Sequence, residues 1–314
     1  MHVPVISVIV PALNAEAYIG AALASVRDQP VAECEAIVVD AGSSDATRAI
    51  AQAVAAADGR FRLVDGGRRL NAPEARNVGL QHARADYVAT LDSDDIMLPN
   101  RLQSALGNFA DHPGDVATGG ALALLDSAGL PAPSPVDTGH GPTTPAQVRA
   151  ALPFYCPTLA SAMTYRRSAL LELNGFDEDH PTIDDYPLLW RLARKGDIHL
   201  LRKPVAAYRR HGDQLTVTSN SRSRWETVLL RQRIATAILG RRPELDSVQA
   251  WSRNSAGASR DSIAQALVDT AEMADRSAGE PSSTAADRAW IRAAQSAREK
   301  VLQAHLQAAD EDSA

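Results

Sequence analysis

The chain has two cysteines among its 314 residues, Cys34 and Cys156. Two cysteines form no disulfide framework and give no metal-ligand spacing, so we expect a reducing, cytoplasmic environment. No apolar run approaches the ~20 residues of a membrane span, and the first residues lack the basic segment of a signal peptide. Basic residues do not exceed acidic ones, because the net charge is −6. We therefore expect no nucleic-acid partner.

The first third of the chain alternates strand and helix patterns, and 314 residues can bury one large core with an appendage. This order predicts a mainly parallel sheet covered by helices on both faces. Ligands of such sheets bind beyond the carboxyl ends of the strands, where Pro11, Asp40 and Asp92 lie. We expect strands at 5–10, 36–40, 61–64 and 87–91, and helices after Asn14, after Ser44 or Asp45, and over 75–83.

Three acids end the strand at 87–91: Asp92, Asp94 and Asp95. Carboxylates this close repel one another, and either protonation or a bound cation relieves the repulsion. Hard cations such as Mg²⁺ or Mn²⁺ accept one or two carboxylates together with substrate phosphates. The alternative is a solvated acidic turn that caps a helix starting near Pro99.

The middle of the chain contains a region rich in proline and glycine at 126–145, which predicts a loop. This loop is a hinge or an acceptor-side flap. The alternative is a disordered surface loop. A strand at 161–165 and a helix at 168–174 follow. The paired acids Asp184 and Asp185 then open an amphipathic helix. Acids in a first helical turn stabilise a helix by themselves, but two adjacent acids exceed that need, so we favour a catalytic role.

Beyond about residue 224 the pattern is helical, and we expect breaks near 257–259 and 277–283 before an alanine-rich helix at 285–309. An apolar stripe from Trp225 to Leu239 lies beside several arginines. We expect it to pack on the preceding domain. Contact with an anionic membrane surface is the alternative. The last helix suits a partner helix, such as one from a second copy.

Four blocks in this order resemble the inverting family 2 glycosyltransferases: Val8–Asn14, Val38–Asp45, Ala75–Leu80 and Leu91–Asp95. The resemblance extends over about residues 4–212. It implies a nucleotide-sugar-binding α/β fold of the GT-A type, Rossmann-like with a mainly parallel sheet flanked by helices, and here with a C-terminal helical extension. It also implies a divalent cation, Mg²⁺ or Mn²⁺, held by the D-x-D segment.

The resemblance implies roles for the residues at the strand ends. Asp94 would ligate the metal, Asp92 would contact the ribose or a metal-bound water, and Asp95 would support both. The remaining nucleotide-sugar contacts would come from Pro11, Ala12, Asn14, Asp40, Arg76 and Ser93. Two alternatives stay open: Arg76 as a surface salt bridge and Asp40 as the cap of its own turn.

The paired acids resemble the acceptor-side motif of the same family, in which they hold the catalytic base. Asp185 matches the base and Asp184 its neighbour. The later segment Tyr208–His211 resembles a Tyr-Arg-x-His motif, so Arg209 would approach the diphosphate and His211 the metal. The polar stretch 214–223 is a candidate lid.

Two positions depart from the family pattern. Ala41 stands where a second acid often recognises the base, which leaves the identity of the nucleotide open. Pro187 replaces an acid often found two residues after the base. Proline is tolerated in a first helical turn, so we expect the helix to persist.

The resulting hypothesis is a metal-dependent inverting glycosyltransferase. It would transfer a sugar from a nucleotide-sugar donor to an acceptor hydroxyl of a glycan, cell-surface polysaccharide or glycoconjugate. A non-catalytic nucleotide-sugar-binding protein and a sugar-phosphate nucleotidyltransferase are the alternatives. We expect a catalytic domain at 1–222, divided into a nucleotide half at 1–126 and an acceptor half at 127–222. A helical extension at 223–314 would follow. We expect a cytoplasmic protein, with peripheral contact at the inner membrane face or a homodimer through the helical extension.

Overall fold

The computed structural model describes residues 3–132, 141–212, 220–251 and 258–311. The chain forms two compact units. The first comprises residues 1–143 and 158–218, and the second comprises residues 144–157 and 219–314. The short segment 144–157 therefore leaves the first unit and joins the second. Each unit has its own core.

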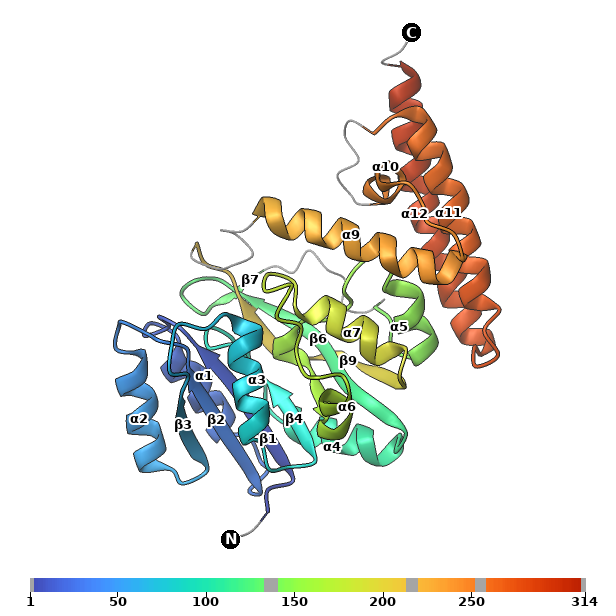
Figure 1. Ribbon diagram of the computed structural model, residues 1–314. Coiled ribbons are helices and arrows are strands. Elements are labelled where there is room, and N and C mark those ends of the chain that lie inside the picture. The colour runs from blue at the N-terminus through green and yellow to red at the C-terminus, as the bar shows by residue number, and fades with distance from the viewer. Residues whose placement is uncertain (1–2, 133–140, 213–219, 252–257, 312–314) are drawn as a thin grey trace. The chain divides into compact units, whose positions relative to one another are not determined.

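The first unit contains a sheet whose nine strands among the described residues run in the order β3-β2-β1-β4-β8-β6-β9-β5, with β7 beside β6 (Figure 1). Strands β1 to β4 are parallel neighbours, and β8 is antiparallel to β4 and β6. The sheet is thus mainly parallel in its first half, as predicted. The strands are β1 (Ile6–Ala12), β2 (Cys34–Asp40), β3 (Phe61–Asp65), β4 (Tyr87–Thr90), β5 (Ile96–Met97), β6 (Asp115–Leu125), β7 (Pro131–Ala132), β8 (Thr164–Arg166) and β9 (Asp197–Arg209).

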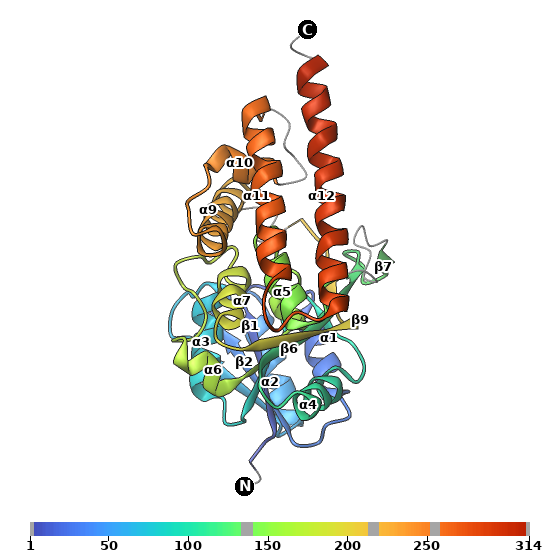
Figure 2. The same cartoon turned by 90° about the vertical axis from the view of Figure 1, so that its right-hand side faces the viewer.

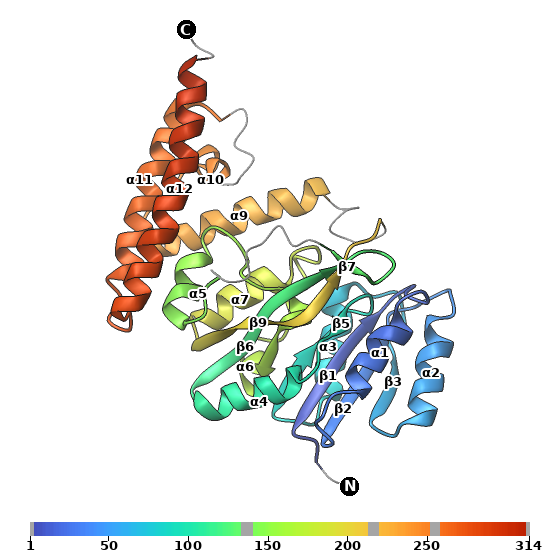
Figure 3. The same ribbon diagram turned by 180° about the vertical axis from the view of Figure 1, so that it is seen from behind.

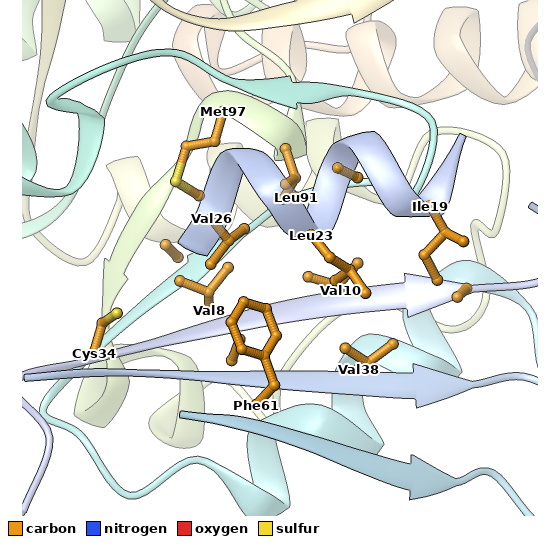
Figure 4. Close-up of a cluster of buried hydrophobic side chains, with 14 of the residues drawn as sticks. Val8, Val10, Ile19, Leu23, Val26, Cys34, Val38, Phe61, Leu91 and Met97 are labelled. Carbon is orange, nitrogen blue, oxygen red and sulfur yellow. The ribbon is translucent and has the colours of Figure 1, made fainter. Parts of the chain in front are cut away.

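Helices cover both faces of the parallel strands (Figures 1 and 3). Side chains alternate along β1, so Val8 and Val10 pack with Leu23 of α1 in one apolar cluster (Figure 4). Ile9 points to the opposite face, where it meets α3 at Gly79. The helices of this unit are α1 (Ile19–Arg27), α2 (Thr47–Ala57), α3 (Ala72–His82), α4 (Arg101–Asp111), α6 (Arg167–Glu172) and α7 (Asp185–Ala193), with the 3-10 turn η1 (Ala160–Ala162).

Strand order fixes where a ligand can bind. From β1 the chain adds β2 and β3 on one side and then returns to place β4 on the other side. Ligands of open α/β sheets bind at such a reversal, beyond the carboxyl ends of the strands. Asp40 and Asp65 end the neighbouring strands β2 and β3, and Asp92 follows β4.

Several helix starts differ from the sequence expectation for local reasons. Asn14 does not cap α1: it has a φ of 49° and its Oδ1 accepts from the Ser44 N–H at 2.9 Å. Helix α3 begins at Ala72 rather than 75, because Asn71 and Glu74 form a capping box. The acid Asp45 does bond the first turn of α2, accepting from the Thr47 N–H at 3.0 Å.

The expected loop at 126–145 is only partly a loop. Leu124 and Ala132 pair across a short hairpin that forms β7, and Gly129 turns the chain with a φ of 84°. The described part resumes before α5, which starts at Pro145. The expected strand at 161–165 is also shorter, because 160–162 form a 3-10 turn and only 164–166 form β8.

The second unit is helical (Figure 2). Its helices are α5 (Pro145–Ala151), α9 (Asn220–Leu239), α10 (Leu245–Ala250), α11 (Arg260–Ala278) and α12 (Ala285–Glu311). Helix α5 is tied to α12 because Thr144 and Gln147 both donate to the buried carboxylate of Asp287. Among the described residues, no helix combines the length and the apolar character needed to cross a membrane.

Part of the apolar stripe of α9 lies in the core of the second unit. Its residues Val228, Ile238 and Leu239 join the core of the helical unit itself, where they pack in one cluster with Trp251 and Met273. Trp225 at the start of the helix is 48% exposed. The expected candidate lid at 214–223 lies mostly outside the described residues.

The contact between Ile9 and Gly79 gives a stability prediction. A Cβ on Gly79 would lie 2.4 Å from Ile9 Cγ2, so Gly79→Ala should destabilise the chain by about 1–3 kcal/mol through overpacking. Gly107, inside α4, has open space around its Cβ position. Gly107→Ala should instead stabilise by about 0.5–1 kcal/mol. Urea denaturation of both variants measures this, and equal effects of the two would contradict the packing.

Candidate functional site

Acids from two distant parts of the chain meet at a single arginine. Arg76, in α3, donates from one terminal nitrogen to Asp92 and from the other to Asp184. Its side chain is 4% exposed. Burial alone would lower the pKa of Arg76, but the charges of Asp184 and Asp92 raise it above its ordinary value. Arg76 was expected to reach a phosphate; in the structure its guanidinium is enclosed between two carboxylates instead.

The D-x-D segment follows β4 as a tight turn. The Asp95 N–H donates to the Asp92 carbonyl at 3.1 Å, and the Asp92 N–H donates to Ser161 Oγ at 3.0 Å. Burial, followed by the charge of Asp92, raises the pKa of Asp94 and raises that of Asp95 well above its ordinary value. Ser93 lies half-buried inside this turn. The turn therefore concentrates negative charge where solvent does little to screen it.

The end of β9 closes over the same turn. His211 Nε2 lies 3.0 Å from Asp94 Oδ2. Arg209 is buried, its Nε donates to the Asp94 carbonyl at 2.9 Å, and its N–H donates to Asp95 Oδ1 at 2.9 Å. The Arg209 and His211 side chains that the sequence placed near the D-x-D acids thus do contact them.

Asp184 and Asp185 differ in their environment although they are adjacent. Asp184 is buried and paired with Arg76, while Asp185, the first residue of α7, is half-buried. Burial, followed by the charge of Asp184, raises the pKa of Asp185 to about 7. A carboxyl with this pKa changes protonation state near neutral pH, which suits a proton acceptor. Pro187 lies in the first turn of α7 without breaking it, as expected.

A second group lies at the ends of β1 and β2. Asp40 is buried and its Oδ1 accepts from the Ser43 N–H at 3.0 Å, so it does cap its own turn. Asn14 exchanges hydrogen bonds with this turn, since its N–H donates to Ser43 Oγ at 3.1 Å. Pro11 and Ala12 are the buried last residues of β1. This group lies on the β2 and β3 side of the strand-order reversal, while the acids around Arg76 lie on the β4 side.

Three residues at the site escaped the sequence reasoning. The ring of Tyr18 lies 4.7 Å from the ring of His211 and 5.1 Å from the Arg209 guanidinium. Ser161 accepts from the Asp92 backbone. Arg101 is buried beneath the turn and donates to the carbonyls of Thr90 and Met163; burial lowers its pKa to about 10. Of these three residues, only Tyr18 left a signal in the sequence, as an aromatic side chain shortly after Asn14.

The donor atoms fit a cation in part. Within the described ranges, no three His, Cys, Asp or Glu side chains gather as a ready ligand set. Asp94 and His211 do face each other. The pKa values of Asp94 and Asp95 are raised first by burial and then by neighbouring negative charge, and a cation would relieve that repulsion. Hard divalent ions need few protein ligands when a bound phosphate supplies others. The chemistry of these side chains therefore suits Mg²⁺ or Mn²⁺ held jointly with a ligand.

Solved structures share this fold. TarS 1-349 of S. aureus in complex with UDP-GlcNAc superposes with a TM-score of 0.63 at 20% identity, over 96% of this chain and 92% of that one. The mannosyltransferase PcManGT of Pyrobaculum calidifontis in complex with GDP-Man and Mn²⁺ gives 0.59 at 20% identity, over 98% and 88%. The fold is thus the GT-A type fold expected from the sequence.

Sequence comparisons give the family. An uncharacterised glycosyltransferase of Haemophilus influenzae is 27% identical over 223 residues, 69% of each chain. Several other curated relatives match over about half or less of their own length. The family described as "Glycosyl transferase family 2" matches residues 7–170. Because that match spans just over half of the chain, and the relatives are glycosyltransferases, this protein is a glycosyltransferase that belongs to glycosyl transferase family 2.

Proposed function

We propose that this glycosyltransferase is metal-dependent and inverting, and that it uses a nucleotide-sugar donor. The observation that carries the proposal is the Arg76 bridge, which brings the donor-side acid Asp92 next to the acceptor-side pair Asp184 and Asp185. A nucleotide-sugar donor bound beside Asp92 would present its anomeric carbon near Asp184 and Asp185. The neighbours that bind UDP-GlcNAc and GDP-Man with Mn²⁺ support a nucleotide-sugar donor and a divalent cation.

Each residue has a proposed part in the transfer. Asp185 accepts the proton of the acceptor hydroxyl while the hydroxyl oxygen attacks the anomeric carbon. The bond from that carbon to the diphosphate breaks on the opposite face, so the carbon inverts in one displacement. Asp184 and Asp92 are held by Arg76, and Arg209 would approach the departing diphosphate. Asn14 would contact the nucleoside, and Asp40 would shape the turn beside it.

The metal would be held by Asp94 and His211, with Asp92 beside them. When bound, a divalent cation supplies Lewis-acid stabilisation of the negative charge on the leaving diphosphate. The proposed acceptor is a hydroxyl of a glycan, cell-surface polysaccharide or glycoconjugate. A protein that only binds nucleotide sugars would need no group with a pKa near 7 beside the donor acids, so the environment of Asp185 favours transfer.

The metal assignment is tested by removing one ligand. Asp94→Ala should abolish the Mn²⁺ dependence of nucleoside diphosphate binding, because the cation loses its carboxylate while the fold keeps Arg76 and its partners. Calorimetric titration of UDP and GDP with and without Mn²⁺ measures this. Asp111→Ala, an exposed acid at the end of α4, is the control. An Asp94→Ala protein that keeps the full Mn²⁺ effect would refute the assignment.

The base assignment is tested by an isosteric change. Asp185→Asn keeps size and most hydrogen bonding but cannot take a proton, so turnover should fall by ~10²–10⁴. The Kd for donor and Mn²⁺ should barely change, and Asp184→Asn should cost less turnover. Donor hydrolysis or transfer with purified protein gives the rate. Donor affinity lost in parallel with turnover would move Asp185 to the donor site, and an unchanged rate would reject it as the base.

The pH dependence follows from the same carboxyl. Its pKa of about 7 lies above the ordinary value for aspartate, so at pH 5–6 Asp185 is mostly protonated and cannot accept the acceptor proton. The value of kcat/KM should therefore fall about tenfold per unit as the pH drops below about 7, and level off above it. Rates measured from pH 5 to pH 9 test this. A profile that stays flat down to pH 5 would contradict the raised pKa.

A further inference from the structure

The side chain of Ala41 cannot form a hydrogen bond to a nucleobase. The Ala41 side chain is a buried methyl group. Its N–H donates to the Ala12 carbonyl at 2.8 Å, and its own carbonyl accepts from the Leu70 N–H at 3.1 Å. Both backbone groups already make hydrogen bonds inside the sheet edge, so a side chain elsewhere on this edge is the stronger candidate for recognising the base.

Asp40 is also largely occupied. Its side chain is 2% exposed, one oxygen accepts from the Ser43 N–H at 3.0 Å, and the other accepts from Arg48 Nη1 at 3.3 Å. Asp40 thus shapes the turn and holds Arg48. The guanidinium of Arg48, in the first turn of α2, is the next group outward from this buried carboxylate.

Arg48 spans the ends of two neighbouring strands. Its Nη1 also donates to Asp65 Oδ2 at 2.7 Å, and Asp40 and Asp65 are register partners at the last position of β2 and β3. The Arg48 side chain is 48% exposed. Its Nε and Nη2 make no hydrogen bond to any residue in the part of the chain that the structure describes. Two charged donors are therefore fixed in place by Nη1 and remain available at the edge where a nucleoside would lie.

We propose that Arg48, with Asp65 beside it, recognises the nucleobase of the donor and selects bases with an oxo group over bases with an amino group at the same position. The inference rests on the proposed use of a nucleotide-sugar donor. A guanidinium only donates hydrogen bonds. Uracil O4 and guanine O6 accept such bonds, whereas the N4 amino group of cytosine and the N6 amino group of adenine are donors themselves.

Asp65 supplies the matching acceptor. The Gly67 N–H donates to Asp65 Oδ1 at 2.8 Å, and this bond, followed by Arg48, lowers the pKa of Asp65. The carboxylate stays ionised at neutral pH and can accept from the ring N–H that neighbours O4 of uracil or O6 of guanine. Cytosine and adenine carry an unprotonated ring nitrogen there. A donor beside an acceptor, in this order, therefore fits uracil or guanine.

Binding of four nucleoside diphosphates in Mn²⁺ tests the proposal. If the wild-type protein binds pyrimidine nucleotides, it should bind UDP more tightly than CDP. If it binds purine nucleotides, it should bind GDP more tightly than ADP. We expect about a ten- to hundredfold preference, the size of one hydrogen bond to a charged group. Arg48→Ala should lower that ratio by about tenfold, because binding of the oxo base weakens by one hydrogen bond to a charged group while Asp65 still accepts from the ring N–H. Binding of CDP or ADP should change little. Arg27→Ala, which removes an exposed arginine at the end of α1, should leave the ratio unchanged.

A second variant covers loss of folding. Arg48→Lys keeps a positive charge for Asp40 and Asp65 but removes the fixed planar donors, so it should fold and still lose most of the preference. Equal wild-type affinity for oxo and amino bases, or a preference that stays undiminished in the folded variants, would overturn the inference and leave the proposed function standing. If none of the four diphosphates binds, the nucleotide-sugar proposal itself fails and this inference falls with it.

Discussion

The site depends on one buried arginine between two carboxylates. Removing a charge from water costs several kcal/mol, and only close pairing offsets that cost. Arg76 is enclosed, and it reaches Asp92 after β4 and Asp184 before α7 at the same time. Loss of the arginine would leave the buried Asp184 and the partly exposed Asp92 without their charged partner. The three elements that carry the acids and the arginine are therefore held in one arrangement by charge as well as by apolar packing.

The same pairing explains why Asp185 differs from its neighbour. The two terminal nitrogens of Arg76 bond to Asp92 and Asp184. Asp185 therefore adjoins a carboxylate, and no arginine among the described residues forms an ion pair with it. The raised pKa of Asp185 follows from its burial and from the charge of Asp184. On the other side of Asp92, Asp94 and Asp95 also have raised pKa values. Negative charge in excess of the available arginines makes the site receptive to a cation and to a proton, which are the two species that the proposed transfer requires.

Much of this arrangement could be predicted from the sequence, because strand ends in a parallel sheet share one edge. Asp40 and the D-x-D acids follow apolar strands, and the alternation of strand and helix gives their common edge. The sequence gives no sign of Arg76 turning inward, since its partners Asp92 and Asp184 lie 16 and 108 residues away. Contacts of Tyr18 with His211 and of Arg48 with Asp65 likewise join elements whose pairing no local pattern encodes. The hairpin at β7 was missed because two residues are too few to show a strand period.

The two departures from the family pattern have different structural consequences. Pro187 lies inside the first turn of α7, where a missing N–H costs the helix little, so the helix that carries Asp185 keeps its geometry. Ala41 removes a functional group from the surface, and nothing in its own backbone replaces it. A helix start can absorb a change of side chain because its shape is set by the backbone. A base-recognition edge cannot, because its specificity consists of individual donors and acceptors. A charged side chain held across the adjacent strand ends, as Arg48 is by Asp40 and Asp65, is the kind of group that can take over this recognition.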